Sequence, residues 1–116
     1  MKISYIAHPV SGNIQYNLQE IKNIVRNINL TEPETVPFVP YYVDLIALND
    51  NNPKERERGI KNDIAILKSG MVDEIRLYGS RISHGMFEEI KLAIELKIPV
   101  VPKTKETKIE FKKLFK

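Results

Sequence analysis

The sequence contains no cysteine, and this absence excludes several kinds of chemistry. Disulfide bonds, thiolate nucleophiles and thiolate metal sites all need cysteine side chains. The chain has only two histidines, His8 and His84, and no convincing third ligand accompanies them, so we expect no metal site. A chain without cysteine also fits a reducing compartment.

Two phosphate-binding motifs are missing as well. The chain has no G-x-x-x-x-G-K-[ST] loop, and no G-x-G-x-x-G follows its first strand pattern. These absences argue against a standard nucleoside triphosphatase and against a dinucleotide-dependent oxidoreductase. We therefore predict that the protein uses no cofactor.

Long hydrophobic runs are absent too, because no apolar stretch approaches the length of a membrane span. A strand pattern begins almost at Met1, with no charged and apolar secretion signal ahead of it. Both features lead us to expect a cytoplasmic protein without a membrane partner.

Size and charge suggest one globular domain. A chain of 116 residues with 42% hydrophobic content has room for one core, so we predict a single domain over residues 1–116. The net charge is only +3, and much of the basic excess lies between Lys103 and Lys113. This basic segment has no recognisable reading motif, so we do not expect a nucleic-acid partner.

Strand and helix patterns alternate along the chain. We predict strands at 2–7, 35–40, 73–78 and 98–101, and helices at 14–28, 53–67, 86–97 and 105–116. Residues 41–50 fit either a short helix or a structured loop. Alternation of this kind predicts an α/β fold, a single-domain Rossmann-like (flavodoxin-like) three-layer sandwich with a four- to five-stranded, mainly parallel sheet.

Glycines, prolines and polar residues mark the expected ends of these elements. Ser11 or Asn13 is a plausible N-cap of the first helix, Pro53 suits a first helical position, and Gly70 can end that second helix. We expect Pro102 just past the fourth strand, and a solvated charged face over residues 54–58.

Glu89 breaks the apolar pattern of the helix over 86–97. On a helical wheel it falls between Ala93 and Leu96, on the packed side, whereas Glu88 lies on the polar face. A carboxylate there is costly to ionise unless it is paired or faces a cleft. A partly exposed Glu favoured by the helix dipole fits the spacing equally well.

Other candidate residues follow from the topology. The loops after the first and third strands (8–13 and 79–85) should open on the same sheet edge, where α/β folds bind ligands. Tyr5 could then share a cleft with Glu89. Asp63 follows Asn62 near the apolar stripe of its helix, and its spacing fits both a position at the same cleft and one on the surface.

The two histidines lie in these loops. We expect His8 and His84 to hold a ligand hydroxyl or phosphate by hydrogen bonds, with a loop histidine of no specific role as the alternative.

Three segments resemble those of nucleoside 2-deoxyribosyltransferases. Residues 5–9 (YIAHP) look like the Y-[LI]-A-G-P strand motif, residues 83–90 (SHGMFEEI) resemble the D-x-G-[ST]-x-x-E-[IL] segment, and residues 61–63 (KND) are similar to the N-D helix motif. The chain from Lys2 to about Val101 follows the family's order. It resembles still more closely the short, uncharacterised DUF4406-like proteins of phages and prophages.

This resemblance implies roles for individual residues. Glu89 takes the place of the nucleophilic glutamate, Tyr5 that of the tyrosine which holds it, and Asp63 that of an acidic residue which binds substrate or handles a proton. The ligand-binding positions that we predict are His8, Pro9, Ser80, Arg81, Ser83, His84, Gly85 and Met86. The family also implies a homo-oligomer, because a neighbouring subunit often completes its site.

Two positions depart from the family pattern. Ser83 stands where the transferases carry an Asp that meets the sugar hydroxyls, and His8 replaces a glycine. A serine cannot supply that carboxylate, so binding of a nucleoside or nucleotide is better supported than deoxyribosyl transfer itself. Convergence of His8, His84, Arg81 and Ser80 would suit a phosphate, which favours a nucleotide.

Three kinds of function remain open. The first is an enzyme that cleaves or transfers at an N-glycosidic bond through a carboxylate nucleophile. The second is a non-catalytic protein that sequesters a nucleotide-derived metabolite or signal, which would suit phage counter-defence. The third is a structural or interaction protein, indicated only by the amphipathic C-terminal helix.

Overall fold

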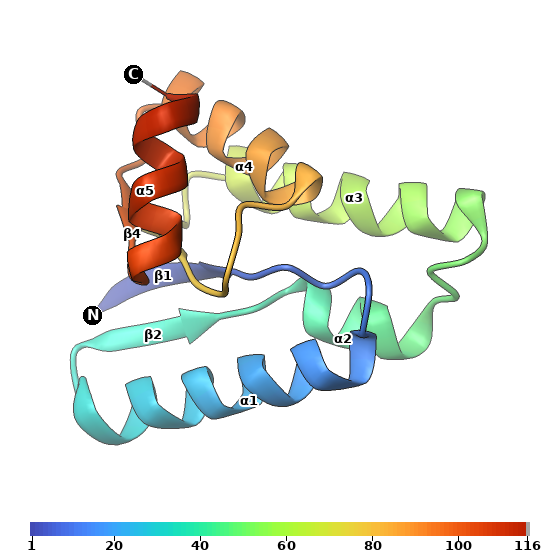
Figure 1. Ribbon diagram of the computed structural model, residues 1–116, viewed down its shortest axis with the longest axis horizontal. Helices are drawn as coiled ribbons and strands as arrows, with labels where there is room; N and C mark the ends of the chain where they lie inside the picture. Colours follow the sequence, from blue (N-terminus) through green and yellow to red (C-terminus); the bar gives the residue numbers. More distant parts are fainter. Residues whose placement is uncertain (116) are drawn as a thin grey trace.

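The alternating strand and helix patterns fold into a parallel sheet flanked by helices (Figure 1). The computed structural model describes residues 1–115. The elements are β1 (Lys2–Ala7), α1 (Ile14–Thr31), β2 (Thr35–Phe38), α2 (Tyr41–Ala47), α3 (Pro53–Lys68), β3 (Glu74–Leu77), α4 (His84–Glu95), β4 (Val100–Pro102) and α5 (Lys105–Leu114). Residues 41–50, for which the sequence left two interpretations, begin with the short helix α2.

The sheet has the order β2-β1-β3-β4, and every neighbouring pair of strands is parallel. Figure 1 shows α1 on one side of the sheet and α3 with α4 on the other. The predicted Rossmann-like α/β sandwich is therefore confirmed, with four strands in the part of the chain that the structure describes.

Local signals fixed several element ends as predicted. Asn13 caps α1 through its side chain, Pro53 opens α3, and Gly70 follows the end of α3 with a φ of +85°. The prediction for Pro102 was wrong, because Pro102 is the last residue of β4 and pairs with Leu77. An edge strand tolerates proline, since the missing N–H faces no further strand.

The two faces of the sheet differ in chemistry. The main apolar cluster joins Tyr5, Ala7, Ile75 and Leu77 of the sheet to residues of α3 and α4. Ser4, Glu74 and Arg76 alternate with these strand residues and therefore point to the opposite face. None of the helices within residues 1–115 is both long and apolar enough to cross a membrane.

A buried ionic network ties the end of α1 to that opposite face. Arg76 donates to Glu74 at 2.6 Å and to Glu32 at 2.9 Å, and the Ser4 hydroxyl donates to Glu74 at 2.5 Å. Arg76 is only 4% exposed, so loss of either carboxylate would leave a buried charge with fewer partners. The strand pattern in the sequence did not reveal this network.

Candidate functional site

The loops that follow β1 and β3 touch at the carboxyl edge of the sheet, as their topology predicts. Gly79 has a φ of +92°, and a Cβ atom at this position would lie 2.5 Å from Cδ of Pro9. Only glycine therefore allows this close approach without a shift of the neighbouring loop. The Arg81 guanidinium adds a second link, since it donates to the Ser11 carbonyl at 3.3 Å.

Tyr5 and Glu89 meet beside these loops. Tyr5 is the fourth residue of β1 and is fully buried, whereas Glu89 lies in the second turn of α4 and is partly buried. The Tyr5 hydroxyl donates a hydrogen bond to Oε2 of Glu89. The position of Glu89 on the packed side of its helix, which the wheel predicted, thus brings its carboxyl group to a buried phenol.

Burial changes the acidity of Glu89. Loss of solvent raises the pKa of its carboxyl group to about 8, the Tyr5 hydrogen bond counteracts part of this rise, and the nearby charge of Asp63 adds to it. Burial, followed by the charge of Glu89, also holds the pKa of Tyr5 well above its usual range. The phenol is therefore a stable donor at neutral pH.

Asp63 supplies the second carboxyl group. It lies on α3, and its Oδ1 atom is buried without a hydrogen-bond partner in the described residues. Burial raises the pKa of Asp63 to about 7, and the charge of Asp44 on α2 contributes to this rise. A buried polar atom without a hydrogen-bond partner costs folding free energy. A ligand donor or a proton at Oδ1 would recover part of that free energy, so Oδ1 is a candidate ligand contact.

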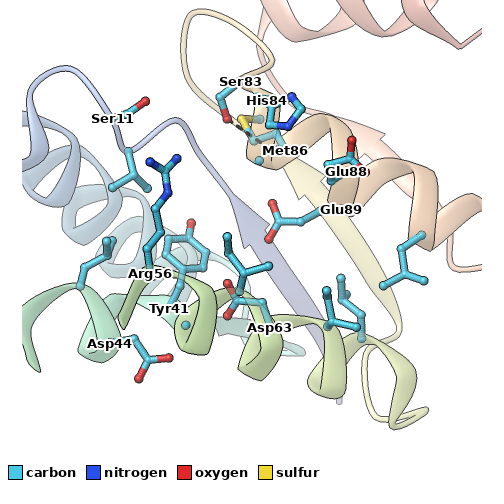
Figure 2. Close-up of a pocket in the computed structure, with 18 of the residues that line it drawn as sticks. Ser11, Tyr41, Asp44, Arg56, Asp63, Ser83, His84, Met86, Glu88 and Glu89 are labelled. Atoms are coloured by element: carbon cyan, nitrogen blue, oxygen red, sulfur yellow. Dashed lines mark hydrogen bonds between the residues drawn. The ribbon is translucent and has the colours of Figure 1, made fainter. Parts of the chain in front are cut away.

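A cleft of about 620 Å³ separates α3 from α4 and reaches the two loops. Figure 2 shows the carboxyl groups of Glu89 and Asp63 on opposite walls, both pointing into the space between the helices. A volume of this size is typical of a small-molecule site. Both carboxyl groups can therefore face one ligand.

The cleft is acidic although the chain as a whole is basic. Its lining carboxyl groups belong to Asp44, Asp50, Glu55, Asp63, Glu88, Glu89 and Glu95, whereas its basic side chains are those of Arg56, Lys68 and Lys91. Such a cleft favours positive charge that develops on a ligand and disfavours a strongly anionic ligand.

Most of the predicted ligand-binding residues line this cleft. His8, Ser83, His84, Gly85 and Met86 all contribute to its surface. Ser83 also caps α4, because its side chain accepts from the Met86 amide.

His8 lies 2.7 Å from the Pro9 carbonyl oxygen through Nδ1. A carbonyl oxygen only accepts, so Nδ1 carries a proton, and in the neutral ring Nε2 remains an acceptor. The tautomer of His8 thus follows from a contact within its own loop.

The remaining predicted residues do not reach the lining of the cleft. Pro9 is buried against Gly79, Ser80 is exposed, and Arg81 points to Ser11. The structure therefore does not bring Arg81 and Ser80 together with His8 and His84 around one ligand position. The phosphate position that the sequence suggested at these four residues is therefore not formed by all of them together.

Three cleft residues were not singled out in the sequence. Tyr41 donates to the Ile6 carbonyl at 2.5 Å and packs against Tyr5 with ring centroids 6.0 Å apart. Asp44 accepts from the Asn62 side chain at 3.2 Å, which joins α2 to α3. Arg56 lies inside the segment that we expected to be a solvated charged face; it is exposed, as expected, and it also lines the cleft.

A weak signal existed for these residues. Asp44 interrupts the apolar residues of 41–50, as Glu89 interrupts those of its own helix. Its meaning depended on whether 41–50 is a helix or a loop, which the sequence left open.

Comparison with known proteins adds the family. The family model described as "Domain of unknown function (DUF7768)" matches residues 2–103, from the first residue of β1 to the residue after β4. Among curated proteins, the comparison found no match. The matched range contains Tyr5, Asp63 and Glu89, and it ends before α5. The chain therefore belongs to the DUF7768 family.

Proposed function

We propose that this domain cleaves or transfers at the N-glycosidic bond of a nucleoside or nucleotide, with Glu89 as the nucleophile. The proposal depends on one observation above all, the hydrogen bond from Tyr5 to Glu89 at the wall of a cleft that also holds the unpartnered Oδ1 of Asp63. Most enzymes that cleave glycosidic bonds use two carboxyl groups placed around the bond.

The reaction takes two steps in this proposal. A carboxylate oxygen of Glu89 attacks the anomeric carbon, the carbon–nitrogen bond breaks, and its electron pair passes to the base as Asp63 donates a proton to it. Water or an acceptor hydroxyl then attacks the same carbon, returns a proton to Asp63 and releases the Glu89 carboxylate. Tyr5 orients Glu89 through its hydroxyl.

The motif order supports the same assignment. The resemblance to nucleoside 2-deoxyribosyltransferases and to DUF4406-like proteins rests on segments 5–9, 61–63 and 83–90. Glu89, Tyr5 and Asp63 occupy the matching positions; Glu89 and Asp63 line one cleft, and the buried Tyr5 donates to Glu89. Ser83 in place of the sugar-binding Asp favours hydrolysis or another transfer over deoxyribosyl transfer.

The pKa order determines which protonation state reacts. The mechanism needs an ionised Glu89 and a protonated Asp63, yet the pKa of Glu89 is about 8 and that of Asp63 is about 7. With one proton on the pair, the productive form is therefore the less populated of the two. The optimum of kcat/KM should lie between the two pKa values.

The direct test is incubation of the protein with nucleosides and their 5′-monophosphates, followed by chromatography of the released base. Release from at least one of them is the expected result. Mass spectrometry of the intact protein during turnover should detect the glycosyl group on Glu89. Complete absence of base release across the panel would refute the enzymatic proposal.

A binding protein is the second candidate function, and the high pKa of Glu89 favours it. A mainly protonated Glu89 at neutral pH can donate a hydrogen bond to a nucleotide-derived metabolite or signal without reacting. Such sequestration would suit a phage counter-defence role. Recovery of an unmodified nucleotide from the purified protein, without base release, would support this function.

Two further proposals concern the oligomeric state of the protein and its location in the cell. We propose a homo-oligomer, as the family resemblance implies, and a cytoplasmic location. Light scattering of the purified protein measures the first, and fractionation of expressing cells measures the second.

A further inference from the structure

We propose that Arg56 binds an acidic group of the ligand, so that the cleft selects a nucleoside 5′-monophosphate over the nucleoside. This inference rests on the proposed function, because it places the N-glycosidic bond beside Glu89 and Asp63. It gives a role to a residue that the sequence pattern assigned to a solvated charged face.

The position of Arg56 follows from the geometry of α3. Arg56, Gly59 and Asp63 succeed one another at steps of three and four residues, and all three line the cleft. Asp63 lies seven positions after Arg56, which corresponds to about 10 Å along the helix axis. An anionic group at Arg56 would therefore lie well away from the two carboxyl groups at the reacting end.

Arg56 also differs from its basic neighbours in its contacts. Arg58 donates to Asn62 at 3.2 Å, and Lys61 pairs with Glu57 at 3.7 Å. Within residues 1–115, the Arg56 side chain forms no hydrogen bond or ion pair, and only its backbone N–H is bonded, to the Asn52 carbonyl. Figure 2 shows its guanidinium group extending from α3 toward Ser11.

Gly59 leaves room between the two ends of the cleft. Its φ lies outside the left-handed region, and a Cβ atom there would meet only Leu48 at an ordinary 3.9 Å. Neither backbone conformation nor packing therefore requires glycine in this helix, where it costs about 1 kcal/mol relative to alanine. A ligand that passes over this position would explain the missing side chain.

The chemistry of the cleft makes Arg56 selective. The lining is rich in carboxyl groups, so an anionic ligand enters only where a cation compensates for it. Guanidinium presents a planar fork of donors that fits the oxygens of a phosphate. One guanidinium can compensate the charge of a single phosphate. A triphosphate would bring further negative charge against the carboxyl groups of the lining.

The test compares a nucleoside with its 5′-monophosphate in titration calorimetry. Glu89→Gln serves as the background, because the proposed function predicts that it binds without turnover. Arg56→Gln should weaken the monophosphate about tenfold or more, since hydrogen bonds to charged groups contribute about 1.5–3 kcal/mol. Nucleoside affinity should change less than about twofold. The control Arg58→Gln, on the same helix outside the cleft, should change neither.

The outcomes separate this inference from the proposed function. Base release by the wild type, together with unchanged monophosphate affinity in Arg56→Gln, overturns the role of Arg56 alone. Binding that depends on Arg56, without any base release, overturns the enzymatic proposal and leaves the anion site standing. Equal weakening of nucleoside and monophosphate also overturns the role of Arg56, and circular dichroism confirms that each variant is folded.

Discussion

The Tyr5 hydroxyl donates a hydrogen bond to the carboxyl group of Glu89, although 84 positions of the chain separate the two residues. Tyr5 is fully buried at the carboxyl half of β1, so its ring is fixed by the core around it. Glu89 is thereby held in one orientation at the wall of the cleft. A reacting group that is oriented in advance loses little entropy when the ligand arrives.

Removal of this hydrogen bond should change the pH profile. Tyr5→Phe removes a contact that lowers the pKa of Glu89, so that pKa should rise. Since Glu89 has the higher pKa of the pair, the alkaline limb of kcat/KM should move to higher pH. The maximum should fall about tenfold or more, because a smaller fraction carries the ionised nucleophile.

Tyr16→Phe is the matched control for this measurement. Tyr16 also donates to a carboxyl group, that of Glu20, but on the exposed side of α1. Its loss should leave the profile unchanged. An alkaline limb that stays in place in Tyr5→Phe would show that Tyr5 does not set the acidity of Glu89.

Asp44 should affect the acid limb of the pH profile of kcat/KM. Its charge raises the pKa of Asp63, so Asp44→Asn should lower that pKa and move the acid limb of kcat/KM to lower pH. The maximum should fall as well, because fewer molecules retain the proton on Asp63. Asp50→Asn, at another position of the lining, is the control. Movement of the alkaline limb in Asp44→Asn would contradict the assignment of the two carboxyl groups.

The free energy of unfolding should depend on pH, because the carboxyl group of Glu89 resists ionisation in the folded state. The pKa of Glu89 rises from 4.5 to about 8 on folding, so the folded state keeps a proton that the unfolded chain releases. Stability therefore declines as pH rises from about 4.5 to about 8 and then levels off. Glu89→Gln does not titrate and should escape this loss.

Thermal unfolding at two pH values measures the effect. The midpoint of Glu89→Gln should match the wild type near pH 4 and exceed it by several degrees near pH 9. A difference that is the same at both pH values would mean that Glu89 ionises as easily in the folded protein as in the unfolded chain.

The contact between the two loops predicts a strong requirement for glycine at position 79. Gly79→Ala places a Cβ atom 2.5 Å from Cδ of Pro9 and also strains a backbone with a φ of +92°. Gly70→Ala has a similar φ of +85° but meets nothing within 4 Å. The strain alone costs about 1–3 kcal/mol, and the clash should add to it.

Urea unfolding of both variants separates these two contributions. Gly79→Ala should lose clearly more stability than Gly70→Ala, and base release should fall with it because the loop is displaced. Equal losses in the two variants would show that the loops can separate at little cost.

The sequence patterns predicted the fold and the nearness of Tyr5 to Glu89 for identifiable reasons, whereas the contact between the two side chains was implied only by the family resemblance. Apolar spacing, Pro53, Asn13 and Gly70 are local signals, and each acts within a few residues of where it stands. Parallel topology then places the ends of β1 and β3 on one edge, which brings Tyr5 toward α4.

The rest of the site depends on contacts that no local pattern encodes. The orientation of Arg56 toward the cleft depends on how α3 turns against α4, and its neighbour Arg58 has the same local sequence character. Arg81 looked like a phosphate ligand because of its loop, but it donates to Ser11 instead. The pairing of Asp44 with Asn62 required α2 to be a helix.

Base release from a nucleoside 5′-monophosphate by the wild type, by Glu89→Gln and by Glu88→Gln tests the central claim most directly. Glu88 is the exposed neighbour; it also lines the cleft, but its carboxyl group pairs with Lys91 at 3.5 Å. We predict that the wild type and Glu88→Gln release the base at similar rates and that Glu89→Gln loses at least about a thousandfold. Base release by Glu89→Gln at the wild-type rate would contradict the account.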